Sequence, residues 1–155
     1  MKIKAIVFDA DGTLINSAEL IFAAYEHVAR THNLVVPTET AIRQLMGRPL
    51  ADMMHTLFPE GNLEDLLKTN DAFVHENVTQ ANAYEGVVDM LDALHAQGHK
   101  LAILTSGSAK IHSFLSHHNV EHYFSSVVHS DRISRHKPEP EGFLLASNEC
   151  GVTPQ

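Results

Sequence analysis

Residues 7–14, VFDADGTL, place two carboxylates and a glycine directly after a run of branched and aromatic side chains. The run over residues 3–8 is short, apolar and flanked by charge, which predicts a buried strand. Gly12 and the polar residues around it predict the loop that leaves the carboxyl end of this strand. Asp9 and Asp11 in such a loop can converge on one metal and one substrate, one as an ionised nucleophile and the other as a proton donor to the leaving group.

The same Asp-x-Asp-Gly pattern is also common in turns and in calcium-binding loops. A calcium loop needs further acidic ligands and a glutamate downstream, and residues 13–16 (TLIN) supply none. The pattern therefore favours a functional carboxylate pair over a calcium loop, with an ordinary turn as the alternative.

The segment over residues 16–81 is predicted to be helical, with no strand pattern in it. Ser17 is suited to start the first helix, and Pro37 and residues 47–49 divide the next part into short helices. Residues 62–78 form another amphipathic helix. The first helix is indicated by apolar side chains at three- and four-residue spacing: Leu20, Ile21, Ala24, Tyr25 and Val28.

Strands and helices alternate after residue 81. The pattern predicts a helix over 86–97, a strand over 100–105, a helix over 111–118, a strand over 126–128 and a helix over 141–149. Such alternation is typical of a parallel sheet whose working loops lie at the carboxyl ends of the strands. We therefore expect an α/β fold with a Rossmann-like parallel core, made by residues 1–15 and 82–155, and an inserted α-helical cap over residues 16–81.

Two further motifs follow the later strands. Thr105, Ser106 and Gly107 combine hydroxyls with the N–H groups of a glycine-containing turn, which can cradle an anion. The alternative for this motif is simple capping of the following helix by Ser106 or Ser108. Lys137, in the segment HKPEP, can neutralise a phosphate near the same edge of the sheet, although an exposed lysine before proline is common on any surface.

Composition narrows the class of protein. The 155 residues, 44% of them apolar, are enough for one domain, or one domain with a large insertion, around a substantial core. The formal net charge of −8 argues against nucleic acid or a membrane surface as partner. A single cysteine, Cys150, and the lack of a long apolar run predict a soluble, cytoplasmic protein.

Twelve histidines are scattered over the whole chain. His118 and His122 have the spacing of a zinc pair on a helix, and the residues between them indicate a helix end. Surface histidines are therefore the favoured interpretation.

In this order, the three motifs resemble the signatures of the haloacid dehalogenase-like hydrolase superfamily. The first signature corresponds to residues 7–14, the second to residues 104–107 (LTSG) and the third to residues 136–140 (HKPEP), so the resemblance covers essentially the whole chain. The helical segment lies where one subgroup carries a small α-helical cap. Residues 84–87 (YEGV) resemble that subgroup's return from cap to core.

The resemblance implies a role for each motif residue. Asp9 would attack phosphorus and become an aspartyl phosphate, and Asp11 would protonate the leaving oxygen and then activate water. The Asp9 carboxylate and the Asp11 backbone carbonyl would hold Mg²⁺. Thr105, the Ser106 amide and Lys137 would bind the phosphoryl oxygens. An acid at position 11 also speaks against dehalogenation, since dehalogenases of the family lack it.

The family's fourth signature, an acidic pair on a later strand that completes the Mg²⁺ site, has no match in this sequence. The chain reaches residues 151–155 (GVTPQ) about where the turn into that strand is expected. Without its neighbour, the first strand would be an exposed apolar edge. We therefore expect an amino-terminal piece of a longer protein that lacks the C-terminal strands of the core. Other acids are expected in solvated positions: Asp89, Asp92 and Asp131.

Residues 14–20 (LINSAEL) and 46–50 (MGRPL) resemble the phosphoglycolate phosphatase and pyrophosphatase branch of the family most. Arg48 would reach a second anionic group of the substrate, with an exposed surface arginine as the equally weighted alternative. The resemblance thus implies a Mg²⁺-dependent phosphatase that hydrolyses a small phosphorylated metabolite of the phosphoglycolate kind. We expect it to be a monomer or a homodimer.

Four alternatives stay open. Two belong to the same family: an inorganic pyrophosphatase and a β-phosphoglucomutase. A third is a catalytically inactive fragment. The fourth is a phosphorylated signalling receiver, which also groups acids, a threonine and a lysine around an aspartate. A receiver's phosphoacceptor is expected after a middle strand, with no large helical insertion, and both features count against it.

Overall fold

The computed structural model describes residues 3–153, so Met1, Lys2, Pro154 and Gln155 of the expected core lie outside the described residues. Its main sheet has three parallel strands, β1 (Ala5–Phe8), β4 (Lys100–Leu104) and β5 (Phe124–Val128), in the order β1-β4-β5. Val7 pairs with Ala102, and Ile103 pairs with Val127. The α/β fold with a parallel sheet is therefore confirmed, and β1 lies at an edge of the sheet within the described residues.

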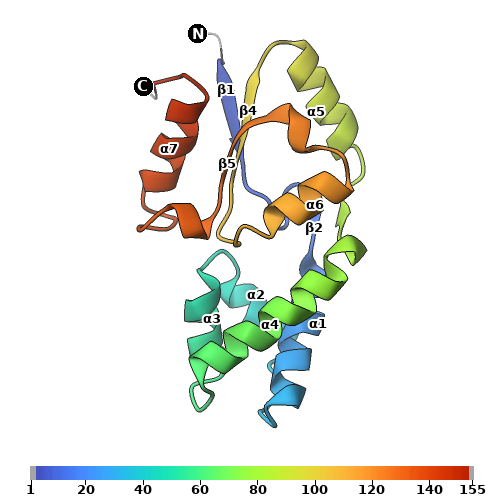
Figure 1. The fold of residues 1–155 in the computed structure, drawn as a ribbon, viewed down its shortest axis with the longest axis vertical. Coiled ribbons are helices and arrows are strands. Elements are labelled where there is room, and N and C mark those ends of the chain that lie inside the picture. Colours follow the sequence, from blue (N-terminus) through green and yellow to red (C-terminus); the bar gives the residue numbers. More distant parts are fainter. Residues whose placement is uncertain (1–2, 154–155) are drawn as a thin grey trace.

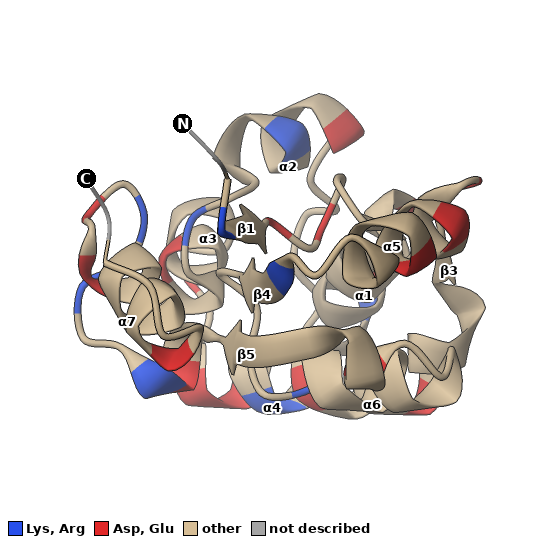
Figure 2. Ribbon diagram, turned by 90° about the horizontal axis from the view of Figure 1, so that it is seen from above, with Lys and Arg blue, Asp and Glu red and all other residues tan. Residues whose placement is uncertain are grey.

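Helices cover both faces of this sheet (Figure 2). Helix α7 (Glu141–Glu149) packs on one face, and α5 (Val87–Ala96) and α6 (Ile111–His117) lie on the other. Successive side chains of a strand point to opposite faces. Leu101 and Ile103 of β4 accordingly join the core beneath α5 and α6, and Ala102 and Leu104 join the core beneath α7.

A separate group of four helices lies beyond the carboxyl ends of the strands (Figure 1): α1 (Ala18–Thr31), α2 (Glu39–Leu45), α3 (Leu50–Leu57) and α4 (Leu63–Asn77). They have a core of their own, with Val28, Met54 and Leu66 fully buried at its centre. These helices lie within the segment that the apolar spacing predicted to be helical. A short 3-10 turn (Val78–Gln80) follows α4.

The prediction that residues 16–81 contain no strand is wrong at its first residue. β2 (Ile15–Asn16) pairs antiparallel with β3 (Asn82–Ala83), so two short strands join the helical group to the sheet. Two-residue strands have no period of their own, and their pairing depends on residues far apart in the sequence. The third strand is also longer than predicted, because Phe124 and Ser125 extend it.

Two further 3-10 turns, Glu121–Tyr123 and Ser130–Arg132, flank β5. None of the helices within residues 3–153 combines the length and the apolar character needed to cross a membrane.

Candidate active site

The loop after β1 turns tightly around one carbonyl group. The Ala10 oxygen accepts hydrogen bonds from the amides of Thr13, Leu14 and Ile15, at 2.9–3.2 Å. Gly12 has φ = +76°, a left-handed conformation in which a glycine carries no steric cost. Ala10 is fully buried in this turn. Its neighbours Asp9 and Asp11 therefore stay at one edge of the sheet, where both line the same cavity.

Asp11 lies in an environment that favours its protonated form. Burial, the largest cause, raises its pKa above the ordinary value of 3.8, and the neighbouring Asp9 carboxylate acts in the same direction. The Ser17 hydroxyl, Lys137 and Thr105 oppose the shift without cancelling it. A carboxyl group that keeps its proton to a higher pH is suited to donate it to a leaving group.

Lys137 reaches across the sheet edge to the first strand. Its Nζ donates to Asp9 Oδ1 at 2.5 Å and lies 3.4 Å from the Leu104 carbonyl oxygen. The Asp9 side chain nevertheless remains 42% exposed, so its carboxylate is accessible from the cavity. The structure thus brings together a lysine and an aspartate that are 128 positions apart, with an ion pair that fixes the direction of the carboxylate.

Thr105 and Gly107 form a compact turn at the end of β4. The Gly107 amide donates to Thr105 Oγ1 at 3.0 Å, and the Thr105 amide donates to the Val128 carbonyl of β5. Capping of the next helix by a serine is wrong: α6 has no side-chain cap, and the Ser106 hydroxyl instead donates to the Gly47 carbonyl at 2.7 Å. Ser106 therefore connects the sheet edge to the loop between α2 and α3.

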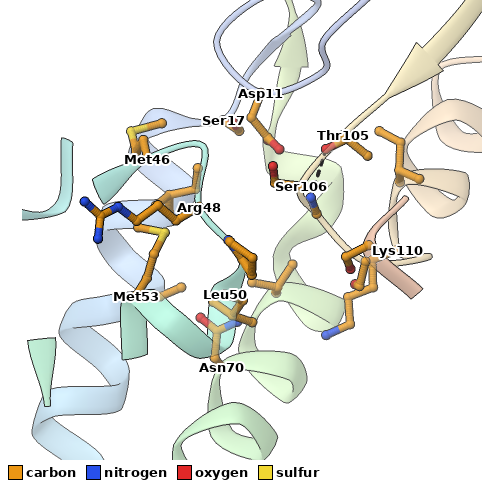
Figure 3. A pocket seen from close by; sticks show the side chains of 18 of the residues that line it. Asp11, Ser17, Met46, Arg48, Leu50, Met53, Asn70, Thr105, Ser106 and Lys110 are labelled. Atoms are coloured by element: carbon orange, nitrogen blue, oxygen red, sulfur yellow. Dashed lines mark hydrogen bonds between the residues drawn. The ribbon is translucent and has the colours of Figure 1, made fainter. Parts of the chain in front are cut away.

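Arg48 is the one predicted site residue that is directed away from the others. It is exposed and lines the cavity, but Figure 3 shows its guanidinium pointing away from Asp11 and Thr105. The remaining predicted residues all lie at the carboxyl ends of the strands: Asp9, Asp11, Thr105, Ser106, Gly107 and Lys137.

These groups open into one cavity of about 670 Å³ between the sheet edge and helices α1, α3 and α4. Figure 3 shows Asp11, Thr105 and Ser106 on one side of it, and Met46, Leu50 and Met53 on the other. The cavity has a polar end, where the strands terminate, and an apolar wall on the helices.

The sequence analysis missed several residues around this cavity. Asp131 is exposed, as predicted, and it also accepts a hydrogen bond from the Ala109 amide at 3.0 Å, which holds the loop before α6. Lys110 Nζ donates to the Asp71 carboxylate of α4 at 2.5 Å. Ser17 lies at the predicted helix start, but its hydroxyl makes no cap bond and lies near Asp11. No local pattern marks the contacts of Asp131 and Lys110, because their partners lie 22 and 39 positions away.

The residues at the polar end suit Mg²⁺ by the chemistry of their donors. Mg²⁺ prefers oxygen ligands and, bound through one or two carboxylates, keeps several waters. The accessible carboxylate of Asp9 and the backbone carbonyl of Asp11 offer such oxygens. Within residues 3–153, no group of three or more His, Cys, Asp and Glu side chains is arranged to hold a metal. Of the histidine pair, His118 Nε2 donates to the Ala81 carbonyl at 2.9 Å.

Comparisons with a family model and with the sequences of known proteins indicate the same kind of enzyme. The family model for haloacid dehalogenase-like hydrolases matches residues 6–155. Pyrophosphatase PpaX from Halalkalibacterium halodurans is 33% identical over 157 aligned residues, which cover 98% of this chain and 71% of that protein.

Solved structures share the arrangement of helices and strands. The crystal structure described as a predicted phosphoglycolate phosphatase from Haemophilus somnus matches with a TM-score of 0.90 at 23% identity, covering 98% of this chain and 73% of that chain. A Thermotoga maritima protein described as a β-phosphoglucomutase matches with a TM-score of 0.72 at 28% identity, covering 98% and 73%. The fold is therefore shared well beyond the motifs.

Proposed function

The chain belongs to the haloacid dehalogenase-like hydrolase family, and on this basis we propose that it is a Mg²⁺-dependent phosphatase acting on a small phosphorylated metabolite. Asp9 is the proposed nucleophile: a carboxylate oxygen forms a bond to phosphorus, and the bond from phosphorus to the leaving oxygen breaks. Asp11 gives its proton to that oxygen. It then accepts a proton from the water that hydrolyses the aspartyl phosphate.

Lys137 and Thr105 are proposed to bind the phosphoryl oxygens. Phosphoryl transfer depends mainly on positioning and on stabilising the charge spread over these oxygens. Lys137 already orients the Asp9 carboxylate through the 2.5 Å contact, and Thr105 is fixed by the Gly107 amide. When bound by Asp9 and the Asp11 carbonyl, Mg²⁺ would reduce the repulsion between the nucleophile and the phosphate.

The observation that supports this proposal most is the meeting of three strand ends at one cavity. A nucleophile, a carboxyl group with a raised pKa, a fixed hydroxyl and a lysine come from separate parts of the chain to line it. The receiver alternative has no place for the helical group that closes the cavity. The match to pyrophosphatase PpaX makes inorganic pyrophosphate the second candidate substrate. The β-phosphoglucomutase alternative is supported by the shared fold and the 28% identity to the Thermotoga maritima protein.

The test is phosphate release by the 155-residue chain from phosphoglycolate, pyrophosphate and acetyl phosphate, with Mg²⁺ and with excess chelator. Hydrolysis that stops with chelator and in Asp9→Asn is the expected result. Asp89→Asn, an exposed carboxylate on α5, is the matched control and should keep the parent rate. Absence of release from all three compounds would favour the catalytically inactive alternative, and release by Asp9→Asn would refute the aspartyl-phosphate route.

A further inference from the structure

The cavity extends well beyond the groups proposed to hold a phosphoryl group. Its volume is about 670 Å³. Pyrophosphate and phosphoglycolate, with about nine non-hydrogen atoms each, are small for a space of this size. The volume is typical of sites that enclose a larger organic ligand.

The wall opposite the strand ends is apolar. Helices α1, α3 and α4 contribute most of it (Figure 3), and all three belong to the helical group. Burial of an apolar group against such a wall is favourable because it removes apolar surface of both partners from water. The side chains that form this wall include Leu20, Ile21, Leu50, Met53, Leu67 and Val74.

Within residues 3–153, the one cation lining the cavity without a carboxylate partner, Arg48, is exposed rather than buried in this wall. Of the three cationic side chains that line the cavity within residues 3–153, Lys137 is paired with Asp9 and Lys110 with Asp71. The third, Arg48, points its guanidinium away from Asp11 and Thr105 in Figure 3. A carboxylate or a second phosphate buried against the apolar side chains would lose its hydration without gaining a cation.

Two neutral polar side chains interrupt the apolar wall. The Tyr25 hydroxyl is buried and has no hydrogen-bond partner among the described residues. Asn70, on α4, is only 5% exposed and also lines the cavity. Because the Tyr25 hydroxyl has almost no accessible surface, it does not reach a ligand in the cavity, and the wall keeps its apolar character.

We propose that this cavity holds the alcohol portion of the substrate, and that this portion is a neutral, largely apolar organic group. The inference rests on the proposed phosphatase function and names its substrate class: phosphomonoesters of uncharged organic alcohols. The phosphoryl group lies at Asp9 and Lys137, and the organic group extends toward Met53, Leu67 and Val74.

The test measures binding rather than turnover, so it stands apart from the test of the phosphatase function. Calorimetric titration of the 155-residue chain, with Mg²⁺ present, compares straight-chain alkylphosphonates from methyl to hexyl. Affinity should rise about fourfold for each added methylene until the cavity is filled. Propylphosphonate should bind more tightly than phosphonoacetate and methylenediphosphonate, the similarly sized analogues of phosphoglycolate and pyrophosphate.

Two pairs of variants locate the effect. Ala51→Leu fills part of the cavity from α3 and should lower the hexyl-to-methyl affinity ratio at least tenfold, whereas Ala93→Leu on the exposed side of α5 should leave the ratio unchanged. Val74→Thr places a hydroxyl in the wall and should weaken hexylphosphonate about threefold, with Val88→Thr as its control.

Three results would overturn the proposal: affinity independent of chain length, tighter binding of either doubly anionic analogue than of propylphosphonate, or equal effects of cavity and control variants. Absence of phosphate release from the compounds of the earlier assay and from hexyl phosphate would refute the phosphatase function and leave this binding series interpretable.

Discussion

Gly107→Ala should separate catalysis from stability at the end of β4. An added Cβ would lie 3.3 Å from Thr105 Oγ1 and 3.7 Å from Asp11 Oδ2, and no other atom outside the adjacent residues is closer than 4 Å. The methyl group therefore enters the polar end of the cavity between the proposed phosphate-binding hydroxyl and the proposed proton donor. Thr105 must move by a few tenths of an ångström to accommodate it.

The expected loss follows from this displacement. Misplacement of a reacting group by about 1 Å can cost about 100-fold in rate, so a shift of a few tenths together with partial occlusion should lower kcat/KM about tenfold, or about 1.4 kcal/mol. Stability should change by less than about 0.5 kcal/mol, because the new contacts are not severe and alanine lowers the entropy of the unfolded chain. For a chain of this size, the melting temperature should move by less than about 2 °C.

The assay is kcat/KM for an ester hydrolysed by the parent, with thermal unfolding of the same preparation followed by circular dichroism. A kcat/KM within twofold of the parent at unchanged melting temperature would refute the placement of the phosphoryl group beside Thr105. A large fall in melting temperature would show that Gly107 is needed for packing instead.

Three more outcomes are expected. Gly142→Ala should lose about 1–2 kcal/mol in the free energy of unfolding measured with urea, because its Cβ would lie 2.5 Å from Leu104 Cδ1 and 3.2 Å from Ile133 Cδ1, while activity per folded molecule is kept. Asp11→Asn should abolish hydrolysis yet raise the melting temperature at pH 7. Burial raises the pKa of the Asp11 carboxyl in the folded chain. The folded chain therefore holds this proton more tightly than the unfolded chain does, and it loses stability as the pH rises above 3.8. Hydrogen bonds from Arg132 and Ser126 lower the pKa of the Glu149 carboxyl below its ordinary value of 4.5. The ionised carboxylate therefore stabilises the fold fully above pH 4.5, and this stabilisation is lost as the pH falls through the lowered pKa. Glu149→Gln should accordingly destabilise the chain at pH 7 and flatten the acid side of a plot of melting temperature against pH.

Much of the secondary structure was predictable because its signals are local. The apolar runs at β1 and β4 and the helical spacing in α4 were recognised within two residues of their observed ends, and the start of α1 within one. The pairing of β2 with β3 was missed because each strand has two residues and lies 66 or more positions from its partner. The alternative of a Ser106 cap on α6 stayed open at the level of the sequence, since the Gly47 carbonyl that accepts its hydroxyl belongs to a distant loop.

By itself, the sequence determined which chemical groups follow the strands. Asp9, Asp11, Thr105 and Lys137 were identified from motifs next to predicted strands, because parallel strands place their carboxyl ends at one edge. Tertiary structure alone decided how these groups face one another and what surrounds them: the Asp9–Lys137 ion pair, the direction of Arg48, and the apolar wall with Tyr25 and Asn70. Strand and helix patterns are set by neighbours a few residues apart, whereas the walls of a cavity are set by contacts between segments that the sequence separates by tens of residues.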